Sequence, residues 1–300
     1  MGHLPTLKGI LKKLGAYTSD PKATIAQIGQ EISRDPSLSV RLLRMANSAY
    51  YARPEPVVDI DEAVLFLGVE QLRMLSMTTH CVEVLSPQDR SGFVWEDFWR
   101  HCIATAQFSC SLGKRFKRAK NNPELDYMSG LLHDVGKLVI AMLSPEGFGF
   151  VISKARAENL SFHQAERLYF DTDHGALGGW YLERQNVPPA VYEAVRCHHN
   201  WKLAVKDQEI GAIVNVADFL ARLHQVGCSG NMEPVQGFFT ETPAWNFLVE
   251  NFELKEDVLV VTNQIQEEAQ KIGTLVDSLM PRKRADPATG NGAASLGDPS

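Results

Sequence analysis

Residues 130–137 read Gly130-Leu131-Leu132-His133-Asp134-Val135-Gly136-Lys137, and the apolar residues around this octapeptide frame a histidine–aspartate doublet. Apolar side chains before and after the doublet lie on nearly every side, which predicts a buried helix. A carboxylate is costly to bury there unless it is paired or bound to a metal. Neighbouring helix positions diverge by about 100°, so both side chains can reach one metal only near a bend or a helix end. We expect Gly136 to provide that bend.

Further imidazoles and a carboxylate lie in apolar helical patterns before and after the doublet: His101, His174, His198, His199 and Asp218. Taken alone, His101 is more simply a core histidine with a hydrogen-bond partner. The doublet alone is equally compatible with a buried His–Asp hydrogen bond and no ion. One shared metal site explains all these inward polar side chains together, and we therefore predict that they converge.

Mixed imidazole and carboxylate ligands favour iron, manganese, nickel or zinc over calcium. The pattern therefore predicts one or two divalent transition-metal ions. The remaining histidines, which we expect to have no role in this site, are His3, His80, His163 and His224.

Helical periodicity runs through nearly the whole chain. Asp35-Pro36 offers an N-cap followed by proline at the first helical position. Capping boxes at residues 24–27 and 59–62 predict two further helix starts, and we expect Gly68 to end the second of these helices. Alternation of apolar and polar residues over a stretch long enough for a β-strand is hard to find anywhere. The sequence predicts an all-α fold, a bundle of many helices.

The order of these patterns predicts four segments. Turn-forming residues cluster near 86–92, which suggests an N-terminal helical subdomain over 1–88 and a helical domain with every candidate ligand over 89–252. Apolar residues at three- and four-residue steps predict a C-terminal helix within 253–280. Packing of this helix on the body is favoured over a homodimer zipper, which remains the alternative. Residues 281–300 have the composition of a disordered tail.

Composition narrows the functional classes. The chain has 300 residues, a net charge of -6, 22% charged and 44% hydrophobic residues, as in ordinary globular proteins. The acidic balance argues against broad nucleic-acid binding. We expect no membrane span and no secretory signal, since no apolar run is long enough and the N-terminus lacks the signal pattern. Five cysteines without a CxxC pair favour a reducing, cytoplasmic location.

Several ordered runs of this sequence resemble one known family. They are residues 33–51 (SRDPSLSVRLLRMANSAYY), 61–68 (DEAVLFLG), 130–137, 173–178 (DHGALG) and 187–189 followed by the histidine pair. Residues 1–220 are similar to the HDOD domain, the HD-related output domain of bacterial signalling proteins within the HD phosphohydrolase superfamily. The resemblance implies an all-α bundle, and many HDOD domains have lost metal ligands and act as non-catalytic modules.

The superfamily pattern carries over residue by residue. It implies a primary metal site of His101, His133, Asp134 and Asp218, with Asp134 able to bridge. His174 and His198 or His199 match the additional ligands of binuclear HD-GYP phosphodiesterases. Lys137 matches a lysine near a substrate phosphate, so Asp134 and Lys137 would be catalytic if the protein is an enzyme. No Gly-Tyr-Pro motif follows the histidine pair, which departs from the HD-GYP pattern.

We therefore expect a bacterial signal-transduction output or regulatory protein with a histidine/aspartate metal site and an unidentified signalling partner. The alternative is a metal-dependent phosphohydrolase or phosphodiesterase acting on a nucleotide or other phosphate ester. Residues 114–120 form a basic run, interpreted as a solvated helix end, with a phosphate-steering patch as the second reading. Arg34, Arg41 and Arg44 are weak candidates for DNA contact, and we expect no DNA binding.

Overall fold

The computed structural model describes residues 25–85, 93–230 and 235–280. Within them 74% of the residues are helical, so the all-α prediction is confirmed. The one sheet in these residues joins two two-residue strands, β1 (Phe116–Lys117) and β2 (Glu253–Leu254), which pair antiparallel. None of the described helices is long and apolar enough to cross a membrane.

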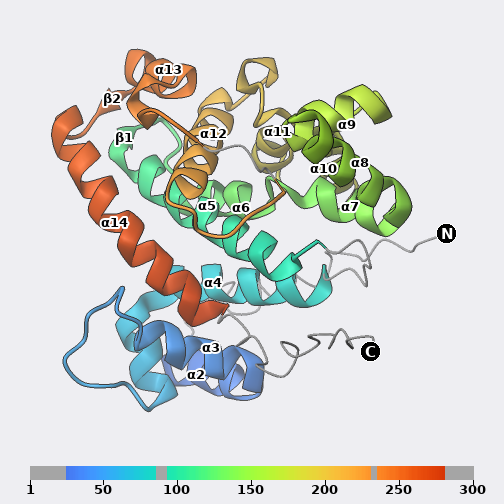
Figure 1. Ribbon diagram of the computed structural model, residues 1–300. Coiled ribbons are helices and arrows are strands. Elements are labelled where there is room, and N and C mark those ends of the chain that lie inside the picture. The colour runs from blue at the N-terminus through green and yellow to red at the C-terminus, as the bar shows by residue number, and fades with distance from the viewer. Residues whose placement is uncertain (1–24, 86–92, 231–234, 281–300) are drawn as a thin grey trace, which may run out of the picture.

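Three N-terminal helices form the lower part of the molecule in Figure 1: α2 (Ile25–Ser33), α3 (Pro36–Ala46) and α4 (Ile60–Val84). The Asp35 side chain accepts a hydrogen bond from the Leu38 N–H, which confirms the predicted cap of α3. Asp59 caps α4 in the same way. Gly68, with a φ of 76°, separates two helical segments of α4 across a kink, so the first segment ends there as predicted. Thr24, the predicted N-cap of α2, lies outside the described residues.

Three helices form the centre: α5 (Trp95–Arg115), α6 (Pro123–Leu132) and α12 (Gln208–Leu223). Side chains of α5 are buried all round the helix because α6 and α12 pack against it. Five further helices cover one side of this centre: α7 (Val135–Leu143), α8 (Pro145–Glu158), α9 (Phe162–Phe170), α10 (His174–Arg184) and α11 (Pro189–Cys197). The remaining elements are α13 (Pro243–Asn251) and two 3-10 turns at Trp201–Leu203 and Phe239–Glu241.

The predicted C-terminal helix is α14 (Val258–Leu279), which crosses from the centre to the N-terminal helices in Figure 1. It packs on both α5 and α3, as the preferred sequence interpretation requires. A continuous apolar cluster extends from Ile28 in α2 through the centre to Leu279. The division into a subdomain over 1–88 and a domain over 89–252 stays a prediction, and its boundary at 86–92 and the 281–300 tail lie outside the described residues.

The basic run at 114–120 is not simply a solvated helix end. Arg118 is buried and forms a bidentate ion pair with the buried Asp126 carboxylate. Lys114 and Arg115 close α5 and pair with Glu70 and Glu268. These cations therefore neutralise carboxylates of the fold.

Candidate metal centre

The His133-Asp134 doublet lies at the junction between α6, which ends at Leu132, and α7, which begins at Val135. The helix break allows the two adjacent side chains to reach one place, as predicted. The assigned cause was wrong, since Gly136 lies inside α7. Its role is close packing: a Cβ there would lie 1.9 Å from the carbonyl oxygen of His174. Glycine at 136 thus lets the start of α10 approach α7.

A first group of candidate ligands joins three helical elements. His101 Nε2 lies 3.0 Å from Asp218 Oδ1 and 3.3 Å from His133 Nε2. Asp134 Oδ2 lies 3.3 Å from His133 Nε2 and 4.0 Å from His101 Nε2. Asp218, 84 positions after Asp134 (218 − 134), thus faces the doublet from α12. These four residues are the predicted primary site.

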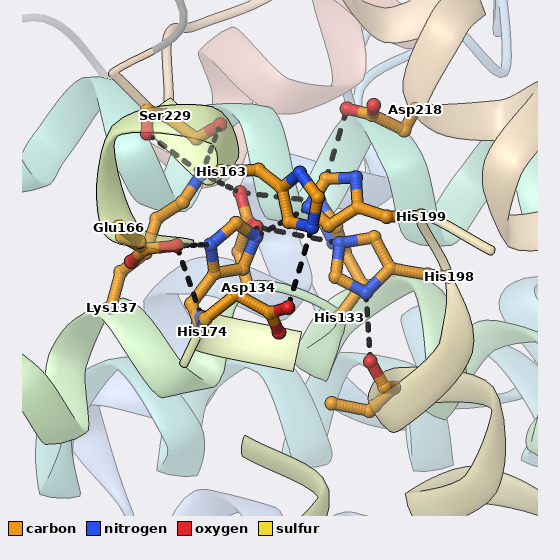
Figure 2. Close-up of polar contacts among 12 residues, drawn as sticks. His133, Asp134, Lys137, His163, Glu166, His174, His198, His199, Asp218 and Ser229 are labelled. Atoms are coloured by element: carbon orange, nitrogen blue, oxygen red, sulfur yellow. Dashed lines mark hydrogen bonds and ion pairs between the residues drawn. The ribbon is translucent and has the colours of Figure 1, made fainter. Parts of the chain in front are cut away.

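A second group faces the other oxygen of the same carboxylate. Asp134 Oδ1 lies 3.0 Å from His174 Nε2 and 3.9 Å from His198 Nε2. His199 Nε2 lies 2.8 Å from His174 Nε2. Figure 2 shows these imidazoles gathered around Asp134. The structure therefore brings all seven predicted ligands together, and Asp134 lies between the two groups with one oxygen toward each.

The fold fixes which ring nitrogen three of these histidines present. His133 Nδ1 donates to the Gly130 carbonyl and His198 Nδ1 donates to the Val195 carbonyl, each at 2.7 Å. His174 Nδ1 donates to the Glu166 carboxylate. These bonds place the proton on Nδ1, so Nε2 is the atom left for a metal, the arrangement found around protein-bound metals.

The donor geometry fits a divalent metal. Nitrogen ligands at about 2.0–2.1 Å from one ion lie roughly 3.0–3.4 Å apart in octahedral or tetrahedral shells. The Nε2 separations of 3.3 Å (His101 to His133) and 2.8 Å (His174 to His199) are close to that range. In addition, His198 Nε2 is buried and has no hydrogen-bond partner among the described residues. An unpaired buried polar atom costs about 1–3 kcal/mol, which a coordinated ion would remove.

Comparison with known proteins identifies the family of this chain. Residues 4–201 match the model of the HDOD domain. The chain belongs to the HDOD family. Asp218, which the sequence analysis placed in the primary site, lies beyond the matched residues.

Two solved structures share the fold. An HDOD domain protein of unknown function from Geobacter sulfurreducens is 24% identical, with a TM-score of 0.78 over 93% of this chain and 94% of that one. A candidate phosphohydrolase from Shewanella amazonensis SB2B is 22% identical, with a TM-score of 0.69 over 93% and 95%. An uncharacterized protein of Treponema pallidum (strain Nichols) is 28% identical over 201 residues, which are 66% of this chain and 38% of that protein. The chain thus spans well under half of that relative.

Burial and neighbouring charges set the protonation states of this HDOD site. Burial lowers the pKa of His198 to about 3 and holds the pKa of His199 well below its usual range. Burial also opposes the charged form of His174, but the Glu166 and Asp134 carboxylates outweigh it and raise the pKa to about 9. Burial would raise the pKa of Asp134, yet His133, Lys137 and His174 hold it well below its ordinary value. The centre therefore combines an ionised carboxylate with mostly neutral imidazoles, the forms that bind metal.

Lys137 lies where the resemblance implies a phosphate-binding lysine, but its ammonium points into the protein. Nζ donates to Asp134 Oδ2 at 2.8 Å, to the Ser229 carbonyl at 2.9 Å and to Ser229 Oγ at 3.2 Å. The side chain is fully buried. An ammonium has three protons, and these three acceptors use them all. Lys137 therefore ties Asp134 to the segment that follows α12.

Three residues of the site were not identified from sequence. Glu166 is fully buried and shares the inner face of α9 with Phe162 and Ala165, a signal that the sequence did contain. Ser229 lies outside any regular element, so no periodicity marks it. The His163 ring lies 4.2 Å from that of His199, and its Nε2 lies 3.3 Å from Asp173 Oδ2, although we expected no role for it.

Proposed function

We propose that this HDOD protein is a signal-transduction module of bacteria whose HD-like half is built around a divalent transition-metal centre. The observation that carries this proposal is the burial of Lys137 with all three ammonium protons engaged. The Lys137 ammonium would bind a substrate phosphate in a related hydrolase, but here it donates its hydrogen bonds to Asp134 and Ser229 inside the protein. An HDOD-like structure from Marinobacter aquaeolei VT8, named as a candidate signal transduction protein, supports the same reading, with 21% identity and a TM-score of 0.69 over 92% of this chain and 60% of that one.

One ion would be held by His101, His133, Asp134 and Asp218, and a second by His174, His198 and His199 with the other oxygen of Asp134. When bound, a divalent ion supplies positive charge to the carboxylates and Lewis acidity to any phosphate that reaches it. Because the candidate ligands come from α5, the α6–α7 junction, α10, the end of α11 and α12, coordination would fix these elements relative to one another.

A phosphohydrolase is the second candidate function. It is favoured by the arrangement of two ligand groups around one carboxylate, since paired metals suit phosphoester hydrolysis. Two candidate phosphohydrolases from Shewanella amazonensis share the fold. His199 and Asp218 are the two ligands that retain some exposure, so a substrate would have to enter beside them.

Elemental analysis of the purified full chain, before and after loading with manganese or iron, tests the centre. We expect stoichiometric metal that survives gel filtration and is lost in His133→Ala. His224→Ala is the matched control, because this half-buried histidine stacks on Phe108 outside the ligand set and should leave the metal content unchanged. Absence of metal after loading would refute both functions.

A hydrolysis screen on the loaded protein then separates the two. The substrates are bis-p-nitrophenyl phosphate, mononucleotides and cyclic dinucleotides. We expect no turnover above that of His133→Ala. Metal-dependent turnover that His133→Ala abolishes would establish the phosphohydrolase and overturn the module.

A further inference from the structure

A cleft of about 620 Å³ lies where α3, the first turns of α5 and the end of α14 meet. None of its lining residues belongs to the metal centre. Its volume falls within the range of about 300–1,000 Å³ typical of small-molecule sites. The chemistry of its walls indicates what such a molecule would carry.

Two arginines one helical turn apart on α3, Arg41 and Arg44, line this cleft. Among the described residues, neither Arg41 nor Arg44 lies within ion-pair distance of a carboxylate, and the contact recorded for Arg41 is to Met280 Sδ at 3.9 Å. Burial lowers the pKa of Arg41, although the charge of Glu83 opposes this effect. A guanidinium nevertheless stays protonated in proteins. The first residues of α3, Pro36 and Ser37, also line the cleft and add the positive end of the helix dipole.

Aromatic and polar groups complete the walls. Trp95 lines the cleft with its ring stacked on Phe148 at 5.5 Å, which fixes its orientation. Trp99 is 2% exposed, and its indole N–H has no hydrogen-bond partner among the described residues. Glu96 lines the same cleft and makes no hydrogen bond or ion pair to the part of the chain that the structure describes. The walls therefore offer two guanidinium groups and a carboxylate without an ion pair among the described residues, an indole N–H without a hydrogen-bond partner there, and indole surfaces.

We propose that this cleft binds a nucleotide. The phosphate forms ion pairs with Arg41 and Arg44, because guanidinium groups pair with phosphate oxygens in bidentate geometry. The base lies against the tryptophan side, where an aromatic surface favours stacking of any base. Glu96 accepts hydrogen bonds from ring or amino N–H groups of the base, and the Trp99 N–H donates to an oxygen of the ligand. The proposal does not depend on metal binding.

Titration calorimetry on the full chain, stripped of metal with EDTA, tests this site with GMP, AMP, guanosine and inorganic phosphate. We expect GMP or AMP to bind with a Kd below about 1 mM. Guanosine lacks the phosphate and inorganic phosphate lacks the base, so each should bind at least about tenfold more weakly than the mononucleotides. Nucleotide binding should also quench tryptophan fluorescence.

The variant pair Arg41→Gln with Arg44→Gln should weaken nucleotide binding at least about tenfold, since each lost charged hydrogen bond is worth more than that factor. Arg156→Gln is the matched control, an exposed arginine on α8 away from the cleft. If the double variant loses its circular dichroism signal, Arg44→Gln alone replaces it, because Arg44 is exposed on α3.

Three results would overturn the proposal. The first is that neither mononucleotide binds. The second is that nucleotide binding is unchanged in the arginine variants. The third is that inorganic phosphate binds as tightly as GMP. Binding of a random-sequence DNA duplex that the arginine variants lose, without mononucleotide binding, would assign the two arginines to DNA instead.

Discussion

The Glu166 carboxylate accepts hydrogen bonds from both the backbone N–H and the ring Nδ1 of His174. Glu166 lies near the middle of α9 and His174 begins α10, so one buried acid fixes the position and the tautomer of a candidate ligand. Such a hydrogen bond from the second ring nitrogen to a carboxylate is typical of metal-bound histidines. It also links the metal centre to α9, which contributes no candidate ligand.

Glu166→Gln should weaken metal binding by about 10- to 100-fold, because the amide no longer increases the basicity of the His174 ring. Competition of the loaded protein with a chromophoric chelator measures the affinity. Glu158→Gln, an exposed acid at the end of α8, should leave it unchanged. Equal affinities for the two variants would show that Glu166 does not support a metal ligand.

Gly136→Ala should destabilise the fold by about 1–3 kcal/mol, because the added methyl group would collide with the His174 carbonyl. The measurement is urea unfolding followed by circular dichroism. Gly273→Ala in α14 is the matched control, since its Cβ would meet nothing within 4 Å. That variant should instead be stabilised by about 0.5–1 kcal/mol through helix propensity. Loss of stability in Gly273→Ala, or none in Gly136→Ala, would contradict the packing described here.

Lys137→Met should cost the metal-free protein about 3–5 kcal/mol, because Asp134 then remains as a buried charge without its ammonium. Added Mn²⁺ should restore part of that loss by supplying positive charge to the same carboxylate. Lys154→Met removes an exposed ion pair with Glu158 and should leave the stability essentially unchanged, because solvent screens exposed pairs. A Lys137→Met protein as stable as the wild type without metal would rule out the proposed role of this lysine.

The metal-free protein should be most stable between mildly acidic and mildly basic pH. Burial lowers the pKa of His198 to about 3, below its unfolded value of about 6.5, so its contribution is complete above pH 6.5 and is lost as the pH falls toward 3. The Glu166 and Asp134 carboxylates raise the pKa of His174 to about 9 despite its burial. The contribution of His174 to the free energy of unfolding is therefore complete below pH 6.5 and is lost as the pH rises through 9. Urea unfolding in EDTA at pH 4.5, 7 and 9.5 measures both effects. His198→Gln should reduce the acid-side loss, and an unchanged slope would contradict this assignment.

Much of the fold could be predicted from local patterns. The cap at Asp35, the helix break at the His133-Asp134 doublet and the stripe of α14 each depend on residues close in sequence. Inward-facing polar residues in apolar helices also identified the seven candidate ligands, because burying such groups is costly without a partner.

What sequence did not reveal depends on contacts between distant segments. Gly136 allows the backbone of His174, 38 positions later in the sequence (174 − 136), to pack against α7. No local sequence pattern indicates this contact. The acceptors of Lys137 on Ser229 lie in an irregular segment, so the direction of that ammonium could not be foreseen. Glu166 could have been found, since a glutamate between apolar residues on the inner face of a short helix needs a partner as much as an inward histidine does.

The bridging position of α14 has a consequence for the order of folding during synthesis. Among the described elements it leaves the ribosome last, yet it covers apolar surface on both α3 and α5. Until it emerges, the nascent chain exposes that surface on two helices made long before. A chaperone that binds apolar segments would have its best opportunity during this interval, which closes when Leu275 and Val276 become buried.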